Sequence, residues 1–148
     1  MEMTQIENLV VTRVLKATPD RVFKAWTDPT LIAKWFYPNE RWDRCDPEVE
    51  PTVGGKYNIT MVHSDGDKVG MKGHVVELIP NEKLVFTFLD KDSDDQTQES
   101  LVTISLKPVS DGTELTLIHS KLASADLKSN VSSGWDGCLT MLEKFVEA

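Results

Sequence analysis

The length and composition of the chain predict one folded domain. Its 148 residues, of which 27% are charged and 40% hydrophobic, are enough to bury a sizeable core without staples, so a single domain is expected over residues 1–148. The formal net charge of −8 speaks against nucleic-acid binding, which needs a basic face, and against adsorption to anionic membranes.

The N-terminal part predicts a strand followed by two short helices. Residues 9–15 are rich in Val and Thr and predict the strand. At Thr18-Pro19-Asp20, the threonine can cap a helix, the proline suits its first position and the aspartate suits its positive end. Asp28-Pro29 repeats this pattern. It predicts a second short helix that runs through Trp35.

The region from residue 40 to residue 120 has the pattern of strands. Alternating apolar residues and turn sequences predict antiparallel hairpins with short connections. Gly70 and Gly73 lie inside one long run, where glycine usually marks a bulge or bend. The acidic run over residues 90–95 is expected to be a solvated hairpin tip rather than a calcium loop. The expected strands are 56–63, 69–79, 84–89, 101–107 and 113–119.

The C-terminal part predicts an amphipathic helix of roughly four to five turns. Seven apolar residues fall within an arc of about 120°, namely Val131, Trp135, Cys138, Leu139, Leu142, Phe145 and Val146. The sheet is the only partner large enough to cover this face. We therefore predict an α+β fold, with a curved antiparallel sheet of about six to seven strands around the long C-terminal helix, and a cavity in the space left over.

Several segments, in order and at matching spacing, resemble a known family. They are residues 11–13, 17–19, 22–29, 31–38, 53–57, 73–87, 112–117 and 134–135. Together they resemble the homologue-like family of the activator of the 90-kDa heat-shock protein ATPase (AHSA-like), within the START-like (SRPBCC) superfamily. The resemblance implies a helix-grip fold over nearly the whole chain. It implies no shared catalytic residues, because the relatives include lipid carriers, hormone receptors, polyketide cyclases and toxin-sequestering proteins.

No metal or cofactor site is predicted. The histidines at 63, 74 and 119 do not have the spacing of metal ligands. Cys45 and Cys138 are the only cysteines and form no CxxC pair. We expect two free thiols in a reducing compartment, although a disulfide between them stays open. With no signal-peptide pattern and no apolar run long enough to span a bilayer, the expected location is the cytoplasm.

The sequence predicts a binding protein for a small apolar or aromatic molecule. The expected wall consists of Trp26, Trp35, Tyr57, Ile59, Met61, Met71, Phe86, Phe88, Ile104, Leu117, His119, Trp135, Leu139 and Leu142. Two alternatives stay open. One is an enzyme of the polyketide cyclase/dehydratase type, which would need at least two of Tyr57, His63, Glu77 and His119 to meet at one point. The other is a co-chaperone-like module that binds proteins through its surface.

Overall fold

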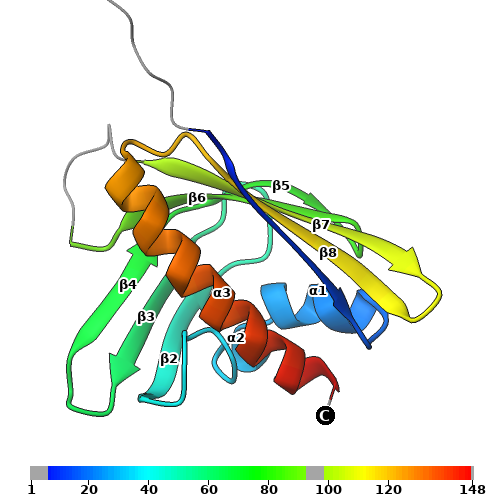
Figure 1. Cartoon of the computed structure of the whole chain (residues 1–148), viewed down its shortest axis with the longest axis horizontal. Coiled ribbons are helices and arrows are strands. Elements are labelled where there is room, and N and C mark those ends of the chain that lie inside the picture. Colours follow the sequence, from blue (N-terminus) through cyan, green and yellow to red (C-terminus); the bar gives the residue numbers. More distant parts are fainter. Residues whose placement is uncertain (1–6, 93–98, 148) are drawn as a thin grey trace, which may run out of the picture.

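The computed structural model describes residues 7–92 and 99–147, in which eight antiparallel strands form one curled sheet (Figure 1). The strand order is β1-β8-β7-β6-β4-β3-β2, and β5 pairs with β6 beside this path. The strands are β1 (Leu9–Leu15), β2 (Trp42–Val49), β3 (Tyr57–His63), β4 (Lys68–Lys72), β5 (Val75–Ile79), β6 (Lys83–Asp90), β7 (Ser100–Val109) and β8 (Gly112–Ser120). The helices are α1 (Pro19–Thr27), α2 (Pro29–Ile32) and α3 (Ala125–Glu147).

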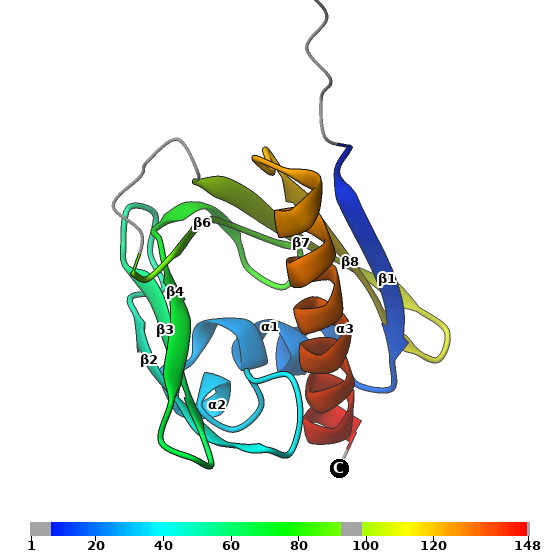
Figure 2. The same cartoon turned by 60° about the vertical axis from the view of Figure 1, so that its left-hand side comes forward.

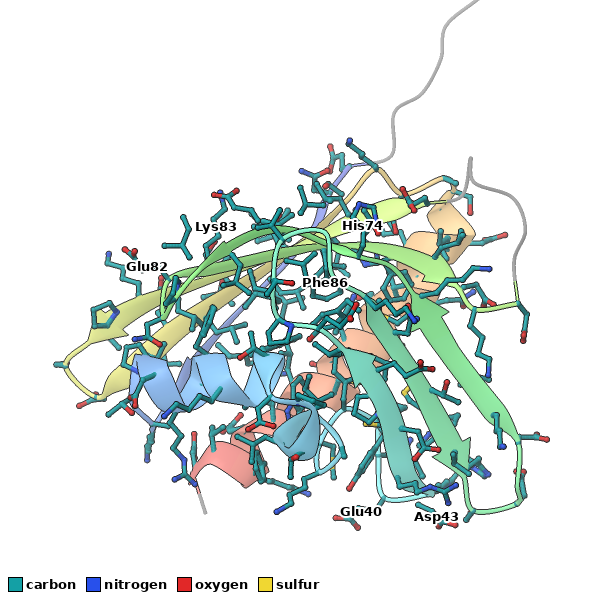
Figure 3. The ribbon with its side chains drawn as sticks, turned by 180° about the vertical axis from the view of Figure 1, so that it is seen from behind. Glu40, Asp43, His74, Glu82, Lys83 and Phe86 are labelled. Carbon is teal, nitrogen blue, oxygen red and sulfur yellow. The ribbon has the colours of Figure 1, made fainter. Side chains whose placement is uncertain are left out.

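The sheet bends around α3, which crosses its open side (Figure 2). Strands β2, β3 and β4 form one wall of the bend, β7, β8 and β1 form the opposite wall, and α1 and α2 occupy one end. Side chains such as Phe86 point into this bend, whereas Lys83 and His74 lie on the outer side (Figure 3). The predicted α+β fold with a curved sheet around a C-terminal helix is confirmed.

The predicted strand over residues 69–79 is two strands, β4 and β5, which pair with successive parts of β6. The chain breaks at Gly73, where an added Cβ would lie 1.9 Å from the carbonyl oxygen of Thr87. The Thr87 hydroxyl accepts a hydrogen bond from the backbone N–H of His74 at 3.0 Å. This close approach requires glycine and turns the chain at the corner of the sheet.

Strand β2 is an element that the pattern of residues did not specify. Within the described residues, it forms an edge of the sheet and pairs with β3 alone. An edge strand tolerates proline and charge, as Pro47 and its acidic neighbours show. Together with the split at Gly73, it brings the sheet to eight strands rather than six to seven.

The two short helices begin where the sequence predicts, but differ in detail. Asp28 caps α2 by accepting a hydrogen bond from the backbone N–H of Thr30 at 2.9 Å. Thr18 occupies the N-cap position of α1 as expected, but its hydroxyl donates to Asp20 instead of accepting from the helix backbone. Helix α2 ends at Ile32, and the chain then turns so that the Trp35 indole donates to the carbonyl oxygen of Ala25 at 2.7 Å.

Helix α3 has 23 residues and is longer than predicted. It begins at Ala125 because Ser124 caps it, its hydroxyl accepting from the backbone N–H of Leu127 at 3.1 Å. On its outer side, Asp136 forms an ion pair of 2.6 Å with Arg13 of β1. No helix in the described ranges is long and apolar enough to cross a bilayer.

Candidate functional site

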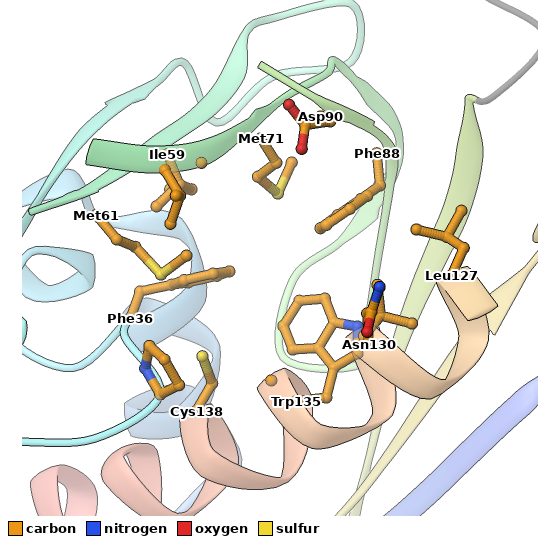
Figure 4. Close-up of a pocket in the computed structure, with 15 residues that line it drawn as sticks. Phe36, Ile59, Met61, Met71, Phe88, Asp90, Leu127, Asn130, Trp135 and Cys138 are labelled. Atoms are coloured by element: carbon orange, nitrogen blue, oxygen red, sulfur yellow. The ribbon is translucent and has the colours of Figure 1, made fainter. Parts of the chain in front are cut away.

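A pocket of about 460 Å³ lies between the first half of α3 and the wall formed by β3, β4 and β6 (Figure 4). Its lining is mostly apolar and comes from five parts of the chain. The lining residues are Phe36, Pro38, Ile59, Met61, Val69, Gly70, Met71, Phe88, Asp90, Leu127, Asn130, Val131, Gly134, Trp135 and Cys138. Val69, Asp90 and Asn130 are exposed to solvent, so they mark the mouth of the pocket.

Three aromatic rings from different elements frame the pocket. The centroid of Trp135, on α3, lies 5.7 Å from that of Phe36, which follows α2. On its other side, Trp135 lies 6.1 Å from Phe88 of β6. Rings in such tilted and edge-to-face contacts support each other and offer flat apolar surface to a ligand.

Sulfur-containing side chains form a further part of the lining, on both the sheet and the helix. Met61 and Met71 come from β3 and β4, and Cys138 comes from the helix. In Figure 4, they and Ile59 surround the open space together with the aromatic rings. Methionine is flexible and polarisable, so this part of the lining can adjust to ligands of different shapes.

A buried chain of hydrogen bonds joins the Trp135 ring to the backbone of Phe88. The Trp135 indole donates to Nδ1 of His119 at 3.0 Å, and Nε2 of His119 lies 2.6 Å from the Ser100 hydroxyl. That hydroxyl lies 3.1 Å from the carbonyl oxygen of Phe88, to which it donates. Since Nδ1 accepts from tryptophan, the histidine proton belongs on Nε2 and donates to Ser100. His119 is therefore neutral, and its burial lowers its pKa from 6.5 to about 4.

The mouth of the pocket contains two polar side chains, those of Asp90 and Asn130. Asp90 ends β6, and one of its carboxylate oxygens accepts from the backbone N–H of Asp92 at 2.9 Å. Asn130 lies on the first half of α3. Among the described lining residues, Asp90 is the only one with a charged side chain.

The structure places the fourteen predicted wall residues in two groups. Ile59, Met61, Met71, Phe88 and Trp135 line the pocket, and His119 lies directly behind Trp135. The others are buried outside the lining of the pocket, in the core shared by the sheet and the three helices. They are Trp26, Trp35, Tyr57, Phe86, Ile104, Leu117, Leu139 and Leu142.

This division has a physical reason. Helices α1 and α2 occupy one end of the bent sheet (Figure 2). Trp26 and Trp35 fill that end, with ring centroids 4.7 Å apart. Tyr57 stacks on Phe86 at 4.1 Å and donates its hydroxyl proton to the carbonyl oxygen of Trp26 at 2.6 Å. Only the other end keeps open space.

The sequence-based prediction did not include ten of the residues that line the pocket. They are Phe36, Pro38, Val69, Gly70, Asp90, Leu127, Asn130, Val131, Gly134 and Cys138. A signal existed for some of them. Val131, Gly134 and Cys138 lie on the helical stripe of Trp135, at spacings of three and four residues. A glycine on such a stripe removes a side chain that would otherwise fill the space.

The polar groups considered for catalysis lie apart from one another. Glu77 pairs with Lys83 on the surface at 3.2 Å, so the role of a buried acid does not fit it. His63 pairs with Asp65 at 3.0 Å beyond the end of β3. Neither they, nor Tyr57, nor His119 belong to the described lining of the pocket.

The two cysteines are free and buried. The Cys45 thiol donates to the carbonyl oxygen of Ile32 at 3.2 Å, and burial raises its pKa to about 12. Burial also raises the pKa of the Cys138 thiol above its usual value. Within the described part of the chain, no three His, Cys, Asp or Glu side chains gather as metal ligands would.

Comparisons with known proteins agree with this architecture. Residues 16–147 match the family model described as activator of Hsp90 ATPase homolog 1-like protein. The crystal structure of protein CV1439 from Chromobacterium violaceum is similar, with 31% identity, a TM-score of 0.84, and coverage of 95% of this chain and 97% of that chain. The AHSA1 protein from Silicibacter pomeroyi shares the fold at 24% identity and a TM-score of 0.81, covering 93% of this chain and 96% of that chain. A comparison with curated proteins gives no match.

Proposed function

The chain belongs to the family of activator of Hsp90 ATPase homolog 1-like proteins, and we propose that it binds a small apolar or aromatic molecule in the pocket beside α3. The observation that carries this proposal is the pocket itself, about 460 Å³ in volume and framed by three aromatic rings. Ligand sites for small molecules have volumes of roughly 300–1,000 Å³ and mostly apolar linings. A pocket of this size and composition suits a ligand of one or two rings.

The position of the polar groups supports binding rather than catalysis. Acid–base catalysis of the polyketide cyclase type needs two proton-transferring groups within reach of one bound atom. Here the Tyr57 hydroxyl bonds to the backbone of Trp26, and Glu77 pairs with a surface lysine. The best-placed base, His119, is separated from the pocket by the indole to which it is bonded.

The surface gives less support to a co-chaperone-like role. The large apolar residues that are most exposed are distributed over several elements, at Val10, Val14, Val53, Val69, Val76 and Ile79. They are aliphatic residues of moderate size, without the aromatic anchors that dominate protein interfaces.

The two free, buried thiols support a location in the cytoplasm, where thiols are kept reduced.

A variant that fills the pocket tests the proposal. An added Cβ at Gly134 meets no atom within 4 Å, and this residue lines the pocket. Gly134→Leu therefore extends a side chain into the pocket without a clash near the backbone. Glycine inside a helix lowers the free energy of unfolding by about 1 kcal/mol relative to alanine. Replacing it should therefore leave the variant at least as stable as the parent.

The assay is titration with Nile red, an uncharged apolar dye, followed by its fluorescence. We expect saturable binding to the parent protein and a loss of at least about tenfold in affinity for Gly134→Leu, because the added side chain occupies the site. The matched control is Ser133→Leu, which adds the same side chain at the neighbouring exposed position and should bind dye as the parent does. No saturable binding to the parent, or equal binding to a folded Gly134→Leu variant, would rule the proposal out.

A further inference from the structure

We propose that the ligand of this pocket is an organic cation, an apolar aromatic body that carries a protonated amine, and that Asp90 at the mouth is its charge partner. This inference rests on the proposed function and specifies the class of ligand. Three independent features of the described lining support it: the placement of Asp90, the lack of cationic side chains, and the aromatic faces.

Asp90 is placed so that its carboxylate borders the pocket. Phe88 and Asp90 are two residues apart on β6, so their side chains lie on the same face of the strand. Across the sheet, Asp90 is in register with Met71 of β4. Figure 4 shows the carboxylate at the edge of the open space, beside Met71 and Phe88.

No cation of the described chain neutralises this carboxylate. Its one hydrogen-bond partner there is the backbone N–H of Asp92, which orients the group without cancelling its charge. Residues 7–92 and 99–147 form six ion pairs, none of which includes Asp90. Lys72 follows Met71 in β4, and the alternation of a strand turns it toward the opposite face.

The described lining of the pocket offers no cationic side chain to an anion, and its polar side-chain donors are limited to the Asn130 amide at the mouth, the Cys138 thiol and the Trp135 indole. Trp135 contains the one N–H donor of the aromatic wall, and His119 already accepts that hydrogen bond. No lysine, arginine or histidine belongs to the described lining. A carboxylate ligand would therefore lose hydration in the pocket without gaining a cationic partner, and it would approach the negative charge of Asp90.

The aromatic wall favours a cation for a further reason. The faces of Trp135, Phe36 and Phe88 carry negative electrostatic potential, which attracts ammonium groups within about 6 Å of the ring centre. An amine at the mouth would lie between Phe88 and the Asp90 carboxylate. The net charge of −8 adds a long-range attraction for cations that salt screens.

Three probes with one apolar body test the inference: 1-naphthylmethylamine, 1-naphthalenemethanol and 1-naphthoic acid. Each competes with Nile red for the purified protein at low and at high salt. Because Asp90 is exposed, its contribution is moderate, and we expect the amine to bind about three- to tenfold more tightly than the alcohol at low salt. The acid should bind more weakly than the alcohol.

Asp90→Asn should abolish the preference for the amine while leaving the affinity for the alcohol unchanged. Asp92→Asn is the matched control. It removes the same charge only two residues away, but Asp92 is not part of the pocket lining, so this variant should keep the preference for the amine. Equal binding of the three probes, or an equal effect of the two variants, would overturn the inference and leave the proposed function intact. Failure of Nile red and every probe to bind would instead count against the proposed function.

Discussion

Protonation of His119 is a sharp test of the hydrogen-bond chain behind the pocket. The residue is fully buried, and its pKa is lowered from 6.5 to about 4 because burial disfavours the charged ring. Its Nδ1 accepts the indole N–H of Trp135. A proton on Nδ1 would make it a donor that faces the indole N–H, also a donor, so the hydrogen bond between His119 and Trp135 would be lost.

The sign of the pH effect follows from this shift. Between pH 6.5 and pH 4 the unfolded chain binds a proton at this histidine while the folded chain does not, so acid favours unfolding. The contribution of neutral His119 to the free energy of unfolding is complete above pH 6.5 and is lost progressively as the pH falls toward 4. From pH 7 to pH 5 the loss due to this residue should be about 2 kcal/mol.

Urea denaturation at pH 7 and at pH 5 measures this loss in the parent and in His119→Phe. The variant should be less stable at pH 7, because the Trp135 N–H and the Ser100 hydroxyl each lose a buried partner at a cost of about 1–3 kcal/mol. Its further loss on going to pH 5 should be smaller than that of the parent by about 2 kcal/mol.

Equal pH dependence in the parent and His119→Phe would refute the reasoning. Should the variant not fold, the titration of the His119 ring in the parent, followed by nuclear magnetic resonance, gives the same information. A ring that takes up its proton near pH 6.5 in the folded protein would equally contradict a buried, neutral histidine.

Three further predictions concern the pocket wall, the glycines and the two cysteines. Trp135→Ala should destabilise the fold by about 3–5 kcal/mol, because the ring loses its aromatic contacts and His119 loses its buried donor, and it should weaken Nile red binding. Undiminished dye binding by the variant would contradict the place of Trp135 in the wall. Gly73→Ala should prevent folding or cost several kcal/mol, because its Cβ would meet the Thr87 carbonyl oxygen at 1.9 Å, whereas Gly134→Ala should raise the free energy of unfolding by about 1 kcal/mol in the same assay. Neither cysteine should react with a thiol reagent at pH 8 until the chain unfolds, since burial raises the pKa of Cys45 to about 12 and that of Cys138 also rises; rapid labelling of the native protein would contradict this.

Elements with strong local signals were predictable from the sequence. The strand at Leu9–Leu15 and the helix that begins at Pro19 lie where the composition and the proline place them. The buried side of α3 is the predicted stripe, with Trp135, Cys138 and Leu139 facing inward. Each of these signals depends on residues within one or two turns of chain.

Elements that depend on distant parts of the chain were not predictable in the same way. In β2 the alternation that predicts a strand is interrupted by charge and proline, which its place at the edge of the sheet tolerates. The break at Gly73 depends on the carbonyl oxygen of Thr87, fourteen residues away. The first turns of α3 are mostly polar and exposed apart from the half-buried Leu127, so the predicted apolar stripe begins later than the helix, although Ser124 carries a capping signal.

The sequence predicted an apolar cavity between the sheet and the C-terminal helix, but not which residues line it. Alternation along a strand shows which side chains face inward, and so Ile59, Met61 and Met71 were identified. It does not show which inward side chains meet helices and which meet open space. That distinction depends on the end of the sheet that α1 and α2 occupy, and this is a property of the assembled fold.

Two glycines of α3 indicate that the open space is a feature of the sequence rather than a packing defect. At Gly137 an added Cβ would lie 2.2 Å from the carbonyl oxygen of Pro38, so close packing requires glycine there. At Gly134, on the pocket side, an added Cβ would meet no atom within 4 Å. Glycine inside a helix costs about 1 kcal/mol relative to alanine, and at Gly134 no contact of the described chain offsets that cost. A ligand that occupies the space beside Gly134 would offset it, since binding to the folded state alone stabilises that state.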